Sequence, residues 1–155
     1  MFDRVLQHSF VVLNIERSLT FYQDILGFKL ARLIELDPES MRKMTGHPEI
    51  TKVRVALLWM GPHLLELMEY SPQTKQTPAT RIELGASHMA FPVEDMEAAC
   101  AALAAKGVKL VGGPRPGARY FVDPDGISME LISSQVAKDQ VPKFHEWVAA
   151  HPLQS

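Results

Sequence analysis

The sequence repeats itself, and this repeat restricts the fold more than any other feature of the chain. When the sequence is shifted by eighty positions, His8 falls on His88 and Gly27-Phe28-Lys29-Leu30 falls on Gly107-Val108-Lys109-Leu110. Similarity at a fixed offset is the mark of a duplicated structural unit. We therefore expect two copies of one supersecondary motif, each with a histidine in its first strand.

Each copy carries the signals of one helix between two strands. Asn14 can cap the first helix and Gly27 can end it, while Glu94 or Asp95 can cap the second and Gly107 can end that one. Apolar residues recur at helical spacing between these signals in both copies. The pattern predicts strand, helix and strand in each half.

The later part of each copy matches at an offset of sixty-four positions, where 65–67 falls on 129–131. A turn at Gly61-Pro62 in the first copy and at Asp125-Gly126 in the second predicts a hairpin of two strands in each. The fold class we expect is α+β, with two tandem βαβββ modules forming a curved mixed sheet around a metal-binding cavity.

The two offsets differ because the first copy holds about sixteen extra residues. In this insertion Asp37-Pro38 predicts the start of a short helix and Gly46 its end. We expect a single domain over 1–135, made of modules 4–70 and 85–134 with a linker over 71–84. A C-terminal extension over 136–155 would follow, including an amphipathic helix over 142–150.

Composition and charge narrow the function classes. The chain has 155 residues and a formal charge of −2, and it has no block of Lys and Arg to bind phosphates, which argues against a nucleic-acid partner. Its apolar runs are shorter than the roughly 20 residues that cross a bilayer, and no secretion signal is visible at its start. A single cysteine, Cys100, fits a reducing compartment. We expect a cytoplasmic protein with a small-molecule substrate.

Two glutamates stand in strands that are otherwise apolar. Glu66 lies between Leu65 and Leu67, and Glu130 lies between Met129 and Leu131. A buried carboxylate costs several kcal/mol (about 3–5) unless it is paired or bound to a cation. Side chains alternate between the faces of a strand, so the glutamates point away from their apolar neighbours.

The duplication pairs these carboxylates with two histidines. If the sheets curve around one cavity, the imidazoles and carboxylates can meet near its centre. Two nitrogen and two oxygen ligands suit one divalent ion such as Zn, Ni, Co, Fe or Mn. The predicted metal ligands are His8, Glu66, His88 and Glu130.

The same residues resemble the vicinal oxygen chelate superfamily, which includes glyoxalase I, methylmalonyl-CoA epimerase, extradiol dioxygenases and proteins of bleomycin and fosfomycin resistance. The resemblance covers roughly residues 4 to 134, and its strongest segments are 8–28, 65–67, 87–91 and 123–130. It implies paired βαβββ modules around one divalent metal, and a homodimer. Glutamate at both carboxylate positions is similar to glyoxalase I, whereas Gly85-Ala86-Ser87 before His88 departs from the glyoxalase I pattern.

The chemistry that the site implies is proton abstraction next to a carbonyl group. The metal would act as a Lewis acid, and Glu66 and Glu130 would be the catalytic bases. We expect a lyase or isomerase acting on a small anionic substrate. Two alternatives stay open: a single-pair Fe(II) dioxygenase that uses His8, His88 and Glu130, and a non-catalytic protein that binds a drug or metabolite.

Strand parity also predicts the walls of the cavity. If both hairpins have two-residue turns, Leu57 opposes Glu66 and Phe121 opposes Glu130. Arg119 could then hold a substrate carboxylate or phosphate in bidentate fashion, or it could simply be solvated at the start of a strand. The expected substrate-binding residues are Arg119, Trp59, Phe10 and Phe121, and the same face would include Val55, Tyr70 and Ser128.

Overall fold

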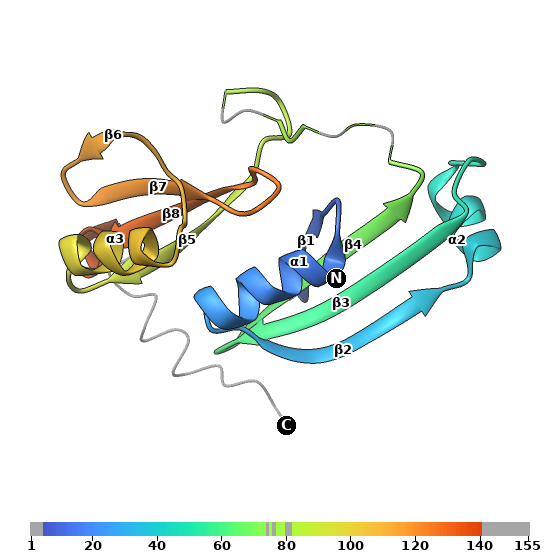
Figure 1. The fold of residues 1–155 in the computed structure, drawn as a ribbon, viewed down its shortest axis with the longest axis horizontal. Coiled ribbons are helices and arrows are strands. Elements are labelled where there is room, and N and C mark those ends of the chain that lie inside the picture. Colours follow the sequence, from blue (N-terminus) through green and yellow to red (C-terminus); the bar gives the residue numbers. More distant parts are fainter. Residues whose placement is uncertain (1–4, 74, 76, 80–81, 141–155) are drawn as a thin grey trace. The chain divides into compact units, whose positions relative to one another are not determined.

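The chain folds into two units of the same topology. The computed structural model describes residues 5–73, 75, 77–79 and 82–140. The chain divides into the compact units Met1–Thr77 and Pro78–Ser155, called unit 1 and unit 2 below. Each unit holds one four-stranded sheet, ordered β1-β4-β3-β2 in unit 1 and β5-β8-β7-β6 in unit 2 (Figure 1).

The elements of unit 1 follow one another as β1 (Gln7–Val11), α1 (Ile15–Thr20), the π-helical turn η1 (Phe21–Ile25), β2 (Lys29–Leu36), α2 (Pro38–Thr45), β3 (Lys52–Met60) and β4 (His63–Ser71). Those of unit 2 are β5 (His88–Val93), α3 (Met96–Ala105), β6 (Leu110–Arg115), β7 (Ala118–Val122), β8 (Ser128–Ser133) and α4 (Ser134–Gln140). In each unit the first strand pairs in parallel with the last, and the other pairs are antiparallel. The predicted α+β class and the tandem βαβββ modules are confirmed.

The helices begin and end where their polar and glycine signals stand. Asn14 accepts a hydrogen bond from the Arg17 backbone N–H at 2.8 Å, and Asp95 accepts one from Ala98 at 2.9 Å. Asp95, rather than Glu94, is therefore the cap of α3. Gly107 has φ +76, a left-handed conformation that is strained for residues with a Cβ, so it ends the helical segment.

One face of the unit 1 sheet packs against α1, which lies along β3 and β4 (Figure 1). Leu58, Leu65 and Leu67 on this face are almost completely buried. Burying such side chains stabilises the fold by roughly 1.5–3 kcal/mol each, so this packing anchors the alternation of β4. Glu66, between Leu65 and Leu67, must point to the other face.

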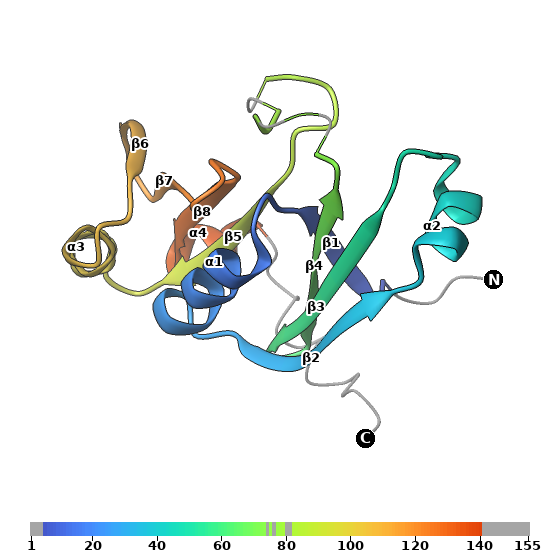
Figure 2. The same ribbon diagram turned by 45° about the vertical axis from the view of Figure 1, so that its right-hand side comes forward.

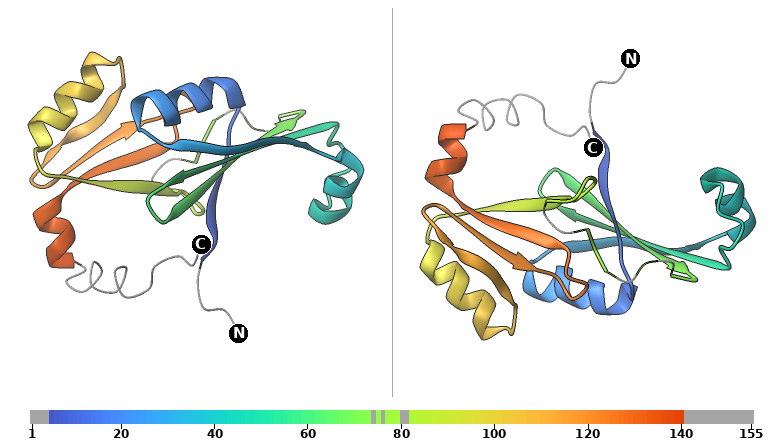
Figure 3. Two further views of the ribbon diagram at one scale, coloured as in Figure 1. Left: turned by 90° about the horizontal axis from the view of Figure 1, so that it is seen from below. Right: turned by 90° about the horizontal axis from the view of Figure 1, so that it is seen from above.

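The inserted helix α2 covers part of that other face. Asp37 caps it, accepting from the Ser40 backbone N–H at 2.8 Å, and Gly46 ends it with φ +75, as predicted. Met41 and Ile50 form an apolar cluster with Val53 and Val55 of β3. Figure 3 shows α1 and α2 on opposite sides of the unit 1 sheet.

In unit 2 the apolar face packs against α3, which Figure 2 views nearly end-on. Phe121 and Met129 are completely buried there, and Leu131 is 5% exposed. The short helix α4 contacts β5 and β8. The helix predicted over 142–150 lies outside the described residues. None of the described helices has the length and hydropathy of a membrane span.

Candidate functional site

Unit 2 brings one predicted histidine and one predicted glutamate together. In the register of β5 and β8, His88 pairs with Ser128 and Ala90 pairs with Glu130, so His88 and Glu130 share a face of the sheet. His88 Nε2 lies 3.3 Å from Glu130 Oε2. The imidazole is 43% exposed and the carboxylate 14%, so solvent reaches the histidine more readily.

Tyr120 is a third side chain on this face. It pairs with Glu130 across β7 and β8, and its ring centroid lies 5.6 Å from that of His88 in an edge-to-face contact. Phe121, which we expected opposite Glu130, instead pairs with Met129 and is completely buried. The expectation for Phe121 as a wall of the site is wrong.

Phe121 lies away from Glu130 because the β7–β8 turn is longer than predicted. Val122 pairs with Ser128, so five residues rather than two connect the strands. The Asp123 carboxylate stabilises this longer loop by accepting from the backbone N–H groups of Asp125 at 2.9 Å and Ile127 at 2.8 Å. An odd loop in place of an even one reverses which β7 side chains share a face with Glu130.

The same reversal moves Arg119 away from Glu130. Arg119 pairs with Leu131, whose side chain is buried on the α3 face. Its guanidinium Nη1 donates to the Gly112 carbonyl at 2.6 Å. Arg119 therefore supports the β6–β7 connection, and its predicted role as the anion-binding residue of the Glu130 face does not hold.

In unit 1, Glu66 stands on the inner strand β4 between two different neighbours. On β3 it pairs with Leu57, because the two-residue turn predicted at Gly61-Pro62 is present and Met60 pairs with His63. On β1 it pairs with Ser9, whose hydroxyl donates a hydrogen bond to Glu66 Oε2. Glu66 itself is partly buried.

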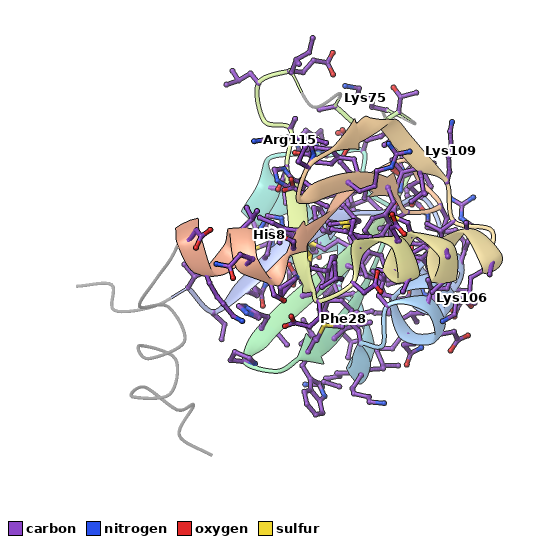
Figure 4. The ribbon with its side chains drawn as sticks, turned by 90° about the vertical axis from the view of Figure 1, so that its left-hand side faces the viewer. His8, Phe28, Lys75, Lys106, Lys109 and Arg115 are labelled. Carbon is purple, nitrogen blue, oxygen red and sulfur yellow. The ribbon has the colours of Figure 1, made fainter. Side chains whose placement is uncertain are left out.

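His8 lies on the opposite face from Glu66. It pairs with the buried Leu65, and its ring contacts that of Phe10 edge to face, with centroids 4.7 Å apart (His8 is labelled on β1 in Figure 4). Phe10 pairs with Leu67, is 6% exposed and belongs to the core under α1. We expected both residues on the same face of the sheet as Glu66, and neither lies there.

Gln7 takes the place that we predicted for His8. It pairs with Leu64, two positions before Glu66, just as His88 pairs with Ser128, two positions before Glu130. The helix caps reveal the same relation, because Gln7 precedes the Asn14 cap by seven residues and His88 precedes the Asp95 cap by seven. The repeat offset in this strand is thus eighty-one, and the caps were the signal that could have shown it.

Other walls of the Glu66 face can be assigned from the register. Trp59 pairs with Leu64 and is 48% exposed, so it lies on this face, open to solvent. Val55 is also on this face but is buried in the α2 cluster. Tyr70 packs beside that cluster, and its hydroxyl donates to Met68 Sδ at 3.4 Å.

The electrostatics of Tyr70 reflect its position. Burial raises the pKa of the Tyr70 phenol, and the negative charge of Glu66 raises it further. The two side chains stand four positions apart on β4 and therefore share a face. Glu66 thus has two neighbours: the Tyr70 phenol, whose pKa its charge raises, on the same strand, and the Ser9 hydroxyl on the neighbouring strand β1.

Arg32 is a cation on the Glu66 face that the sequence pattern did not indicate. It pairs with Leu57, which in turn pairs with Glu66, so the three residues form one row across β2, β3 and β4. A β-bulge between Leu30 and Arg32 turns the arginine to this face. Arg32 is exposed, and at about 4.8 Å per strand it stands roughly 10 Å from Glu66 at the backbone.

The donor atoms fit a divalent transition metal. Two ligands that are each about 2.1 Å from a tetrahedral ion lie roughly 3.4 Å from each other, and His88 Nε2 and Glu130 Oε2 are 3.3 Å apart. Imidazole nitrogen and carboxylate oxygen are ligands of Zn, Ni, Co, Fe and Mn. Unit 2 brings together one such pair at the site, and the described residues contain no cluster of three such groups.

The chain is similar to several known proteins. A lactoylglutathione lyase of Haemophilus influenzae is 29% identical over 133 residues, covering 81% of this chain and 88% of the relative. The metallothiol transferase FosB of Staphylococcus saprophyticus is 27% identical over 154 residues, covering 90% and 87%. The structure of a trypanothione-dependent glyoxalase I of Leishmania major is similar in fold, with a TM-score of 0.67, 22% identity, and coverage of 97% of this chain and 100% of that one.

The model of one protein family matches most of the chain, over residues 3–131. This match spans both βαβββ modules, with the Glu66 and His88–Glu130 positions. The chain belongs to the Glyoxalase/Bleomycin resistance protein/Dioxygenase superfamily.

Proposed function

We propose that the chain is a divalent-metal-dependent lyase or isomerase that removes a proton next to a carbonyl group of a small anionic substrate. The observation that carries the proposal is the His88–Glu130 pair, whose ligand atoms have the separation of two donors to one ion. A second carboxylate, Glu66, occupies the equivalent place in unit 1. A lactoylglutathione lyase among the relatives supports the reaction class.

The proposed ligands are His88, Glu130 and Glu66, with the amide oxygen of Gln7 in place of His8. When bound, a divalent ion would supply Lewis-acid stabilisation of the negative charge that develops on the substrate oxygen. Gln7 qualifies because it shares the face of Glu66, whereas His8 does not. Carbonyl oxygens are weaker ligands than imidazoles for this group of metals, so unit 1 contributes less to affinity than unit 2.

The carboxylates are the proposed bases. Each stands on the last strand of its unit, where flanking apolar residues buried beneath the helices fix the strand's orientation. Two carboxylates allow one to accept the proton from the substrate carbon while the other returns a proton. Arg32 is the proposed partner of the substrate's anionic group, in the role first considered for Arg119.

The side chains around the carboxylates would limit access of water. Leu57 lies beside Glu66, and Tyr120 lies beside Glu130 with its ring against His88. A lower effective dielectric constant strengthens the interaction of each carboxylate with a substrate proton.

The expected homodimer also stays a proposal, which sedimentation velocity of the purified chain would test.

Exchange of substrate protons with solvent tests the proposed reaction directly. S-lactoylglutathione and a panel of α-hydroxycarbonyl and acyl-CoA compounds would be incubated in D₂O with the metal-loaded chain, and deuterium at the α carbon followed by NMR. We expect exchange into at least one compound, and a loss of about 10²–10⁴-fold in Glu66→Gln and Glu130→Gln. The exposed Glu97→Gln is the matched control and should keep its rate.

Deuterium exchange at the wild-type rate in both Glu66→Gln and Glu130→Gln would overturn the assignment of the bases. The dioxygenase alternative is not favoured by the described residues, because His8 of its proposed iron set packs against Phe10 on the helix-covered face of its sheet. The non-catalytic alternative predicts that no compound of the panel gains deuterium.

A further inference from the structure

The two proposed metal-binding carboxylates have different neighbours across the parallel strand pair. In unit 1 the residue opposite Glu66 is Ser9, and in unit 2 the residue opposite Glu130 is Ala90. The Ser9 hydroxyl donates to Glu66 Oε2. Ala90 has only a methyl group, and Glu130 Oε2 faces His88 Nε2 instead. The duplicated position thus carries a hydrogen-bond donor in one unit alone.

The rest of the Glu66 environment offers it little polar support. Leu57 pairs with it on β3, and among the described residues the structure records no hydrogen bond to Glu66 besides that of Ser9. A glutamate with several free side-chain torsions loses conformational entropy when it is fixed as a ligand. A donor that already holds one oxygen removes part of this cost before the metal arrives.

The bond also divides the carboxylate into two unlike oxygens. Oε2 accepts from Ser9, which leaves Oε1 as the oxygen with both lone pairs open to a cation. Hydrogen bonds to a ligating carboxylate orient it and are part of what sets metal affinity. In unit 2 the carboxylate of Glu130 has a different neighbour, because the group beside it is itself a proposed ligand, His88.

We propose that Ser9 is a positioning residue: its hydroxyl holds Glu66 so that one carboxylate oxygen is kept ready for a divalent metal ion. The proposal rests on the metal dependence in the proposed function and adds to it a specific residue outside the ligand set. Ser9 does not touch the metal or the reacting atoms in this account, and it acts through Glu66 alone.

Titration of the metal-free chain with Co²⁺, followed by the visible absorbance of the bound ion, tests this. We expect Ser9→Ala to bind Co²⁺ about 10–100-fold more weakly than the wild type, the usual loss for a hydrogen-bond partner of a ligand. Ser9→Thr, which keeps the hydroxyl, should restore the affinity to within a few-fold (about threefold) of the wild type, since one hydroxyl donor suffices. Ala90→Ser is the matched control in unit 2 and should not weaken binding.

The outcomes separate the two proposals. Equal Co²⁺ affinity in wild type and Ser9→Ala would overturn the role of Ser9 while leaving the metal site in place. A wild-type chain that binds no Co²⁺, Zn²⁺ or Ni²⁺ would overturn both. Thermal unfolding of the metal-free variants identifies a folding defect, and if Ser9→Ala is destabilised, equal weakening in Ser9→Ala and Ser9→Thr would count against the proposal.

Discussion

Units 1 and 2 share one topology and one placement of their carboxylates, yet they differ in the residues beside them. In both, a glutamate stands on the inner parallel strand with its side chain on the face away from the first helix. Beside it, unit 1 has Gln7 and Ser9, and unit 2 has His88 and Ala90. The duplication therefore preserved the register, which fixes the face of every side chain, more strictly than the residue types.

The units also differ in what surrounds the carboxylate. Unit 1 carries the insertion with α2, an apolar cluster and the exposed cation Arg32 on the Glu66 face. In unit 2 the corresponding part of β6 is Gly112-Gly113, which offers no side chain. The Glu66 face of unit 1 therefore carries an exposed cation at a position where unit 2 has glycine.

The first test of the comparison makes unit 1 resemble unit 2 at its weaker proposed ligand. We expect Gln7→His to bind Zn²⁺ at least about tenfold more tightly, because imidazole is the better ligand for this ion. Gln7→Ala should bind Zn²⁺ at least about tenfold more weakly than the wild type, since it removes the proposed ligand. Isothermal titration with Zn²⁺ measures both changes.

His8→Ala is the control for this pair, since His8 is next to Gln7 in sequence and on the other face of β1. It should leave Zn²⁺ affinity within about twofold of the wild type, because deleting a group away from the ligands removes no bond to the metal. The reverse pattern, with a loss in His8→Ala and none in Gln7→Ala, would mean that β1 pairs with β4 one residue out of the register described above.

This contrast explains how far the sequence could predict the site. Local signals such as the Asn14 cap and the turn at Gly61-Pro62 depend on a few adjacent residues, and both are confirmed. The side on which His8 lies depends on the offset of a whole strand. A slip of one residue there moves every side chain to the opposite face, so a repeat match that is nearly right gives the wrong ligand.

The prediction for the turn of the second hairpin was wrong for a related reason. Asp125-Gly126 is a strong signal for a two-residue turn, but the Asp123 carboxylate binds two backbone N–H groups and stabilises a five-residue loop. That single side chain decides that Tyr120 rather than Phe121 stands opposite Glu130. Arg32 was missed because its orientation depends on a bulge, which pattern alone does not reveal.

Arg32 and Arg119 form the next test of the comparison, because both were candidates to hold an anionic substrate. A guanidinium that binds a carboxylate or phosphate contributes about 1.5–3 kcal/mol, so Arg32→Met should raise KM by about 10–100-fold for an anionic substrate found in the exchange screen. We expect kcat to change much less. Arg119→Met is the same substitution on the α3 face of unit 2, and the KM of that variant should stay near the wild-type value. If Arg119→Met instead raised KM and Arg32→Met did not, the substrate would have to meet unit 2 from the face that we assign to packing.

The smallest expected effect concerns Tyr70 and tests whether Glu66 and Tyr70 share a face. Because burial and then the Glu66 charge raise the pKa of Tyr70, Glu66→Gln should lower that pKa part of the way toward its usual value, with the burial contribution left. Glu69→Gln is the control, since Glu69 is closer in sequence but faces α1, where it accepts from the Ile15 backbone N–H at 2.6 Å. Ultraviolet titration of the phenolate, with Tyr70→Phe to assign the signal, measures these shifts.

The sign of the stability change follows from the same shift. The folded chain holds the phenolic proton more tightly than the unfolded chain, so the stabilising contribution is complete below the unfolded pKa of about 10 and is lost as the pH rises through the folded value. Tyr70→Phe should therefore lose less stability than the wild type between pH 9 and pH 11, as roughly bracketed by that unfolded pKa. A larger pKa shift from Glu69→Gln than from Glu66→Gln would contradict the alternation of β4, and with it the assignment of Glu66 to the open face on which both proposals for unit 1 depend.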